Sequence, residues 1–201
     1  MNKGVNPAEF DAVGFDGQFL RWLLGNLRFP SSADIDLPNL IRSKSPSVGL
    51  IGGTEVTCAK HQKYFQNAFP DAQILWNFNG YGESQEAEAT KTMKKHRPDL
   101  ILIGMGPGLQ EIEAIRIQKL YSGQTGKTLI ATCGGWLDQL GVKNYYTEIA
   151  KNYNLRWVFR LARDPLRLWK RYTIYGLIAL FRREEIRAYC AKSTPLNLAD
   201  K

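Results

Sequence analysis

Short apolar runs alternate with longer amphipathic or polar segments along most of this chain. The apolar runs are expected to be β-strands, and they lie at residues 48–53, 73–78, 99–103 and 128–133. Helices are expected between them, at residues 55–69, 83–96 and 109–121. Parallel strands need crossover helices, so this alternation predicts an α/β fold. The expected architecture is a doubly wound, mostly parallel sheet with helices on both faces and a basic helical C-terminal appendage.

The segments before and between these runs give weaker signals. Residues 8–28 are expected to form a helix, and residues 30–38 a loop bounded by prolines. Thr54 is expected to cap the helix that follows the first strand. His61 and His96 are each expected on a helix surface. The three cysteines are far apart and in no CxxC spacing, which favours reduced thiols in a cytosolic protein over a zinc site or disulfides.

A glycine-rich turn follows the strand at residues 99–103, with glycines at 104, 106 and 108. Ligands of open α/β sheets bind beyond the carboxyl ends of the strands, where this turn is expected. Leu109 stands where a dinucleotide fingerprint needs its last glycine, and the Lys-Ser/Thr of a P-loop is absent. The residues alone leave two interpretations open, a ligand-binding loop and a tight strand–helix turn.

Several stretches, taken in order, carry a family resemblance. They are residues 15–17 (Phe-Asp-Gly), 48–53 (Val-Gly-Leu-Ile-Gly-Gly), 98–111 (from Pro-Asp to Gln-Glu), 133–141 (from Cys-Gly-Gly to Gly) and the arginine-rich 154–172. In these stretches the chain resembles the WecG/TagA/CpsF glycosyltransferases, over about residues 10–175. Members transfer N-acetylmannosamine or related sugars from a UDP donor to a polyprenyl-diphosphate-linked acceptor. Gly108 and Leu109 replace the Pro-Lys of the family loop, which removes a cation near the donor phosphates.

The resemblance implies transfer of an N-acetylhexosamine or uronic-acid type sugar from a UDP donor in bacterial envelope or exopolysaccharide synthesis. It places the family's proposed catalytic carboxylate at Asp16, where the residues alone favour a turn or a helix cap beside Gly17. Glu111 is the second catalytic candidate, with stabilisation of the helix start as its alternative. The alternative function is a non-catalytic or diverged relative that binds a UDP-sugar or lipid.

The glycine turns are the predicted donor site, because their backbone N–H groups can hold uridine or diphosphate without side-chain obstruction. The donor-binding candidates are Gly53, Gly104, Gly106, Gln110, Gly134, Gly135 and Asp138. Asp138 could accept a hydrogen bond from ribose or uracil, or cap a helix. Asp34 and Asp36 have the spacing of a metal-binding DxD motif but lie in the expected loop. We therefore expect no metal and no cofactor.

The net charge of +8 is concentrated toward the C-terminus, where residues 151–187 hold ten Lys or Arg against three Asp or Glu. We expect a Rossmann-like domain over residues 1–150 and a basic, aromatic, helical tail over residues 151–201. Five arginines at helical spacing are candidates for binding the leaving group or lipid phosphate: Arg156, Arg160, Arg163, Arg167 and Arg171.

The basic and aromatic pattern of the tail favours a helix at an anionic membrane surface. A helix packed on the body is the alternative, and no recognition motif supports nucleic acid. No apolar run is long enough to span a bilayer, and no secretory signal is visible. We therefore expect a cytoplasmic protein, peripheral on the inner face of the cell membrane, that could form homo-oligomers.

Overall fold

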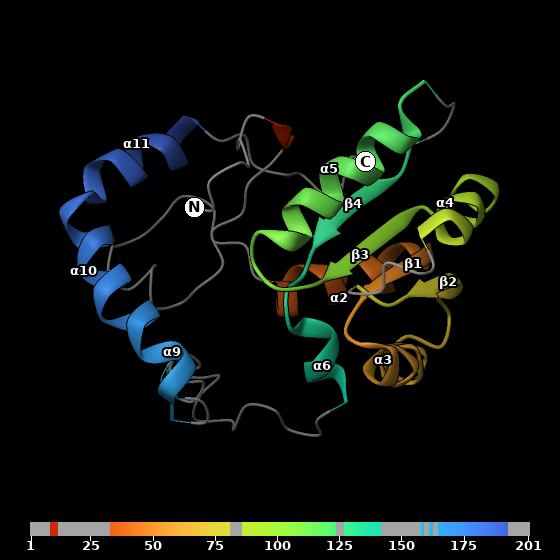
Figure 1. Cartoon of the computed structure of the whole chain (residues 1–201), viewed down its shortest axis with the longest axis horizontal. Coiled ribbons are helices and arrows are strands. Elements are labelled where there is room, and N and C mark those ends of the chain that lie inside the picture. Colours follow the sequence, from red (N-terminus) through yellow and green to blue (C-terminus); the bar gives the residue numbers. More distant parts are fainter. Residues whose placement is uncertain are drawn as a thin grey trace. The chain divides into compact units, whose positions relative to one another are not determined.

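The computed structural model describes residues 9–11, 33–80, 86–123, 127–141, 158, 161–162 and 165–192 of the chain. The chain divides into two compact units. The first combines Met1–Glu9 with Leu37–Lys143, and the second combines Phe10–Asp36 with Asn144–Lys201. The first unit holds the sheet, and the second holds the C-terminal helices (Figure 1).

Four parallel strands form the sheet of the first unit. They are β1 (Ser47–Gly52), β2 (Gln73–Phe78), β3 (Leu100–Gly104) and β4 (Leu129–Thr132), in the order β2-β1-β3-β4. Leu100 pairs with Val48 on one side and with Leu129 on the other, so β1, β3 and β4 begin level. The side chains of Leu100–Ile103 are at most 1% exposed, as expected of a strand covered on both faces.

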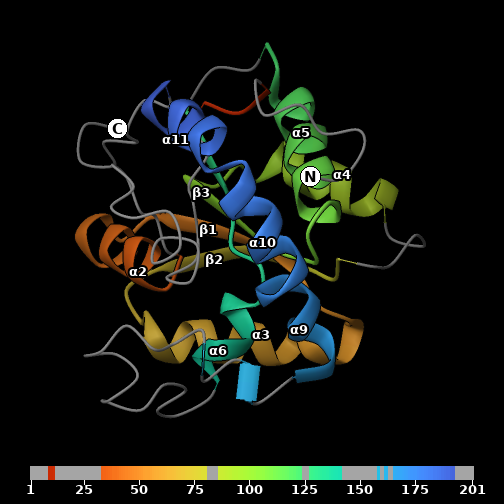
Figure 2. The ribbon, with the colours of Figure 1, turned by 90° about the vertical axis from the view of Figure 1, so that its left-hand side faces the viewer.

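Helices cover both faces of this sheet. Helix α3 (Glu55–Ala68) and the short α6 (Trp136–Leu140) lie on one face, and α4 (Glu86–Lys95) and α5 (Leu109–Tyr121) lie on the other (Figures 1 and 2). Right-handed crossovers between parallel strands place the helices in this way. Phe65 on α3 and Ile117 on α5 are fully buried. The predicted α/β fold with a doubly wound sheet is confirmed.

The structure corrects the expected loop before the first strand. Helix α2 (Ala33–Lys44) runs through it with Pro38 inside. A proline inside a helix removes a backbone hydrogen bond and costs about 3 kcal/mol, which is why the sequence suggested a loop. Leu37, Leu40 and Ile41 are buried, and burying such side chains contributes about 1.5–3 kcal/mol each, enough to outweigh that cost.

Three successive helices lie in the described part of the second unit. They are α9 (Pro165–Tyr172), α10 (Ile174–Phe181) and α11 (Arg183–Lys192). Pro165 occupies the first position of α9, where its missing N–H removes no helical hydrogen bond. Within the described ranges, no helix is both long and apolar enough to cross a bilayer. The expected helix at residues 8–28 and the expected domain boundary at 150/151 lie outside the described residues, apart from residues 9–11.

Candidate functional site

The carboxyl edge of the sheet contains a topological switch point. From β1 the chain crosses to β2 on one side, and from β2 it returns past β1 to β3 on the other. The connections that leave β1 and β3 therefore diverge, and open α/β sheets bind ligands in the crevice between such connections. Gly52 and Gly104 pair in register at this point. A Cβ atom on Gly52 would fall on the carbonyl oxygen of Gly104, so the two turns meet backbone to backbone.

Three hydrogen bonds connect Gln110 and Glu111 to the glycine turns that follow β3 and β4. The backbone N–H of Gly108 donates to Glu111 Oε2 at 2.5 Å, and Gln110 Nε2 donates to Glu111 Oε1 at 2.8 Å. Gln110 Oε1 in turn accepts the backbone N–H of Gly134 at 3.0 Å. Two backbone N–H groups expected to be available to a ligand are thus bonded within the protein. Both oxygens of Glu111 serve the start of α5, as its capping alternative describes, and a catalytic role for Glu111 stays a prediction.

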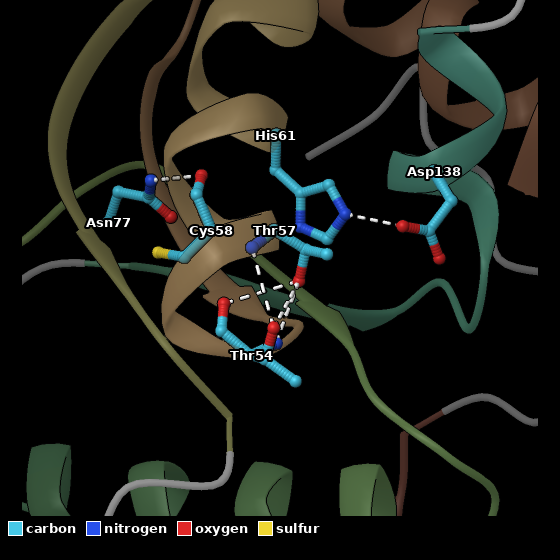
Figure 3. Close-up of polar contacts among 6 residues, drawn as sticks. All are labelled: Thr54, Thr57, Cys58, His61, Asn77 and Asp138. Carbon is cyan, nitrogen blue, oxygen red and sulfur yellow. Dashed lines mark hydrogen bonds and ion pairs between the residues drawn. The ribbon is translucent and has the colours of Figure 1, made fainter.

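A histidine–aspartate pair links α3 to α6 on the same side of the sheet (Figure 3). His61 Nε2 lies 2.6 Å from Asp138 Oδ1. The His61 side chain is 3% exposed and that of Asp138 is 68% exposed. The expectation that His61 lies on a helix surface is wrong, because α6 covers that face of α3. His96, in contrast, is exposed as expected, but it follows the end of α4 at Lys95 and is not on a helix.

The electrostatics of the pair favour an ionised carboxylate. The hydrogen bond from His61 lowers the pKa of Asp138 below its ordinary value, against a smaller opposing effect of desolvation. The other ring nitrogen, His61 Nδ1, is buried and has no hydrogen-bond partner among the residues that the structure describes. A buried polar atom without a partner is rare in folded proteins, so this one calls for an explanation.

The turn after β1 makes room for this imidazole. Gly53 has φ +71, and a Cβ atom there would lie 2.8 Å from His61 Cε1. Thr54 caps α3 as expected, and its backbone N–H donates to Thr57 Oγ1 at 2.7 Å (Figure 3). Gly53 was predicted because it would let a ligand approach, but the packing of His61 also explains why a glycine stands there.

The two buried cysteines of this unit are poor candidates for nucleophiles. Burial raises the pKa of Cys133 to about 12, and burial also raises the pKa of Cys58. Asn77 lies beside Cys58 and donates to its backbone carbonyl at 2.9 Å. Both thiols are therefore protonated at neutral pH, and reactive cysteines need a thiolate.

Comparison with known proteins identifies the family. Residues 8–191 match the glycosyl transferase WecG/TagA/CpsF family. The chain belongs to this family. Three curated relatives are N-acetylglucosaminyldiphosphoundecaprenol N-acetyl-beta-D-mannosaminyltransferases of Staphylococcus aureus strains MW2, NCTC 8325 / PS 47 and COL. Each is 29% identical over 135 residues, which are 67% of this chain and 50% of the relative. This WecG/TagA/CpsF chain thus spans about half the length of the curated relatives it matches.

The predicted site residues of this WecG/TagA/CpsF chain fall into three groups. The donor-binding candidates lie in the turns at the carboxyl edge or on the adjoining helices: Gly53, Gly104, Gly106, Gln110, Gly134, Gly135 and Asp138. Arg167 and Arg171 lie on α9, but their side chains are outside the description. Asp16, Arg156, Arg160 and Arg163 lie outside the described residues. The roles of all of them stay predictions, and Asp34 and Asp36 lie in the first turn of α2.

Sequence reasoning missed the burial of His61 and its pairing with Asp138. A signal for the burial was present, because His61 stands at helical spacing from Cys58 and Phe65, which are buried too. The short helix α6 was also missed, since five residues are too few for a periodic pattern.

Proposed function

We propose that this chain is a glycosyltransferase that moves a sugar from a UDP donor to a polyprenyl-diphosphate-linked acceptor in bacterial envelope or exopolysaccharide synthesis. The observation that carries the proposal is the family match over residues 8–191. The names of the curated relatives state an N-acetylmannosaminyl group and an acceptor of N-acetylglucosamine on diphosphoundecaprenol. A donor of the N-acetylhexosamine or uronic-acid type and an acceptor of that class are therefore proposed here.

The carboxyl edge of the sheet supports the donor part of this proposal. The backbones of the glycine turns lie close together at this edge. Asp138 presents an ionised, largely exposed carboxylate beside them. Such a carboxylate can accept a hydrogen bond from a ribose hydroxyl or from the uracil N–H. In this proposal Gly106, Gly135 and their neighbouring turns hold the remaining donor atoms by backbone contacts.

The chemistry requires a base and a stabilised leaving group. The acceptor hydroxyl attacks the anomeric carbon, a new carbon–oxygen bond forms, and the bond to the diphosphate breaks. Asp16 is the proposed base that takes the hydroxyl proton. Arginines 156, 160, 163, 167 and 171 are proposed to stabilise the departing UDP without a metal ion.

The C-terminal helices support an encounter with lipid. Large apolar side chains are exposed on α9 and α10, and they are Leu166, Trp169, Ile174, Tyr175, Leu177, Ile178, Leu180 and Phe181. Leu166 and Phe181 are 88% and 89% exposed. Apolar and aromatic surface beside a basic sequence is typical of helices that lie in the headgroup layer. We propose that these helices bind the anionic inner face of the cell membrane.

Vesicle co-sedimentation tests this membrane part. The full chain is expected to sediment with phosphatidylglycerol-containing vesicles and much less with purely zwitterionic ones, because anionic lipid attracts basic segments. A Leu166→Ser/Phe181→Ser variant is expected to lose most of the binding. A Val56→Ser variant, which alters an exposed apolar residue on α3, serves as the matched control. Equal sedimentation of all three proteins would reject membrane binding by this surface.

One observation favours a non-catalytic relative as the second candidate function. Leu109 begins α5 and is 49% exposed where the family loop carries a lysine. A protein without that cation could bind a UDP-sugar and yet stabilise a departing diphosphate too weakly for turnover. This candidate predicts UDP binding without transfer to any lipid-linked acceptor, and no gain or loss of transfer in the Asp16→Asn variant.

The transfer assay decides between the two candidates. Purified chain is incubated with a panel of UDP-N-acetylhexosamines and UDP-uronic acids and with a polyprenyl-diphosphate-linked N-acetylglucosamine. The Asp16→Asn variant is expected to lose transfer by about 10²–10⁴-fold while its UDP affinity stays unchanged, because general-base catalysis contributes on that order. Asp71→Asn, a change at an exposed turn before β2, is the control. Full turnover by Asp16→Asn would remove Asp16 as the base.

A further inference from the structure

We propose that His61 is a positioning residue of the donor site. It fixes the Asp138 carboxylate so that one oxygen is held by the imidazole and the other is turned to the glycine turn for a hydroxyl or imide N–H of the donor nucleoside. This inference rests on the proposed function. It concerns nucleotide binding, however, and can be tested without any transfer reaction.

A positioning role requires that His61 be buried and that Asp138 be open to a ligand, and the two side chains differ in this way. His61 is 2% exposed as a whole residue, whereas the Asp138 side chain is 68% exposed. The 2.6 Å bond between Nε2 and Oδ1 uses one carboxylate oxygen. The second oxygen, Oδ2, lies 3.9 Å from the position of a Cβ atom on Gly135, so it borders the turn after β4. A rigid, buried donor therefore holds an exposed acceptor at the carboxyl edge.

The hydrogen bond to Asp138 assigns a proton to Nε2 of His61. An ionised carboxylate only accepts hydrogen bonds, so Nε2 carries the hydrogen of the 2.6 Å contact. Nδ1 has no partner among the described residues, so the contact with Asp138 is the polar interaction that the described structure gives this ring. Nε2–H therefore donates to Asp138. Hydrogen bonds of this kind orient the ligating carboxylates and imidazoles of functional sites.

A purely structural role explains these observations poorly. The buried face of α3 could be filled by leucine, which has no polar atom to leave unsatisfied. Instead, the chain keeps a histidine there, and Gly53 leaves the space that its ring requires. The only described polar partner of that ring is a carboxylate at the predicted donor site. The hydrogen bond lowers the pKa of Asp138, which keeps this acceptor ionised.

Calorimetric titration with UDP at pH 7 tests the inference on five proteins. They are the wild type, His61→Gln, His61→Leu, Asp138→Asn and the double variant His61→Leu/Asp138→Asn. His61→Gln keeps an N–H donor near the Nε2 position and is expected to bind UDP within about threefold of the wild type. His61→Leu and Asp138→Asn are each expected to weaken binding by about 10-fold or more, because a charge-assisted hydrogen bond is lost or misplaced. The double variant is expected to bind no more weakly than Asp138→Asn, since the two residues act as a unit.

Each contrary result overturns the inference. His61→Leu could bind UDP like the wild type, His61→Gln could lose as much as His61→Leu, or the two losses could add. Absence of UDP binding by the wild type would also overturn it. Wild-type binding with the expected pattern but no transfer to any lipid-linked acceptor would overturn the proposed catalytic function and leave the inference standing.

Nitrogen NMR of ¹⁵N-histidine-labelled wild type gives a second readout that does not depend on a variant that folds. The His61 signals are expected to show a proton on Nε2. The Nε2 signal is expected to shift on addition of UDP, because the carboxylate that it contacts gains a second hydrogen bond. An Nε2 without a proton, or a signal that UDP does not change, would overturn the proposal.

Discussion

The two edges of the sheet use polar side chains in different ways. At the amino edge, Asp99 Oδ2 accepts the backbone N–H of Ser47 at 2.9 Å and its hydroxyl at 2.6 Å, which ties the start of β3 to the start of β1. Thr128 performs the same task beside β4, where its hydroxyl donates to the Pro98 carbonyl and accepts from Arg97 Nε, both at 2.8 Å. These bonds join strand to strand and leave the named side chains satisfied.

At the carboxyl edge the side-chain bonds hold loops instead of strands. Gln110 and Glu111 tie one glycine turn to another, and His61 holds an exposed carboxylate while one of its own nitrogens lacks a described partner. The two edges are therefore expected to be separable: polar groups at the amino edge join strands, and those at the carboxyl edge hold the turns of the proposed donor site. Changes at the first should alter stability alone, and changes at the second should alter binding.

The largest expected effect is a loss of stability at Gly52, where the carboxyl edge of the sheet also holds two strands together. Gly52→Ala places a methyl group on the Gly104 carbonyl oxygen, and neither backbone can move without breaking the β1–β3 pairing. We expect a loss of about 3 kcal/mol or more and a fall in the unfolding midpoint of about 6–12 °C. Thermal unfolding by circular dichroism measures it. Gly123→Ala is the control, because φ is +79 there but no atom of the described residues lies within 4 Å of the new methyl group. It should cost about 1–2 kcal/mol, and equal losses in the two variants would contradict the steric argument.

The second largest expected effect is a loss of stability at the amino edge. Asp99→Ala removes the acceptor for two Ser47 donors, and hydrogen bonds to a charged group contribute about 1.5–3 kcal/mol. Asp99 is exposed, so we expect a loss of only about 2 kcal/mol in denaturant unfolding, with UDP affinity unchanged. Ser47→Ala, which keeps the backbone donor, should cost about half as much. A loss of UDP affinity in Asp99→Ala would show that the two edges are not separable.

Much of the fold could be predicted because the strands are continuous apolar runs. β2 and α5 begin and end where the sequence places them, and the other strands differ by a residue at their ends. Helix α2 could not be predicted, because the cost of the internal Pro38 is visible in the sequence and the burial of Ile41 is not. The glycine turns could be predicted because glycines follow the apolar runs directly in the sequence. The partner of Asp138 could not, because it stands 77 residues away and meets Asp138 only when α6 packs on α3.

Glu111 offers a smaller effect that separates capping from catalysis. Glu111→Gln retains an oxygen for the Gly108 N–H but sets an amide N–H₂ against Gln110 Nε2, so one of the two bonds is lost. We expect a loss of about 1 kcal/mol in stability. Transfer should fall by less than about 10-fold, far less than in Asp16→Asn, because no proton transfer depends on Glu111 in the capping arrangement. A loss of transfer as large as that of Asp16→Asn, at unchanged stability, would instead assign Glu111 a catalytic role.

The smallest expected effect is the pH dependence of the His61–Asp138 pair. The pKa of Asp138 is lowered in the folded state from an ordinary value of 3.8, chiefly by the hydrogen bond from His61. A lowered carboxyl pKa means that the unfolded chain binds the proton more readily, so the pair's contribution is complete above that ordinary value and is lost as the pH falls below it. The difference in unfolding free energy between the wild type and Asp138→Asn should therefore shrink as the pH falls below about 4. Because Asp138 is largely exposed, the change will be small, and urea unfolding at closely spaced pH values is needed to measure it. A difference that grows as the pH falls in this range would mean that His61 does not hold Asp138 in its ionised form. The proposed difference between the two edges of the sheet would then not hold at the carboxyl edge.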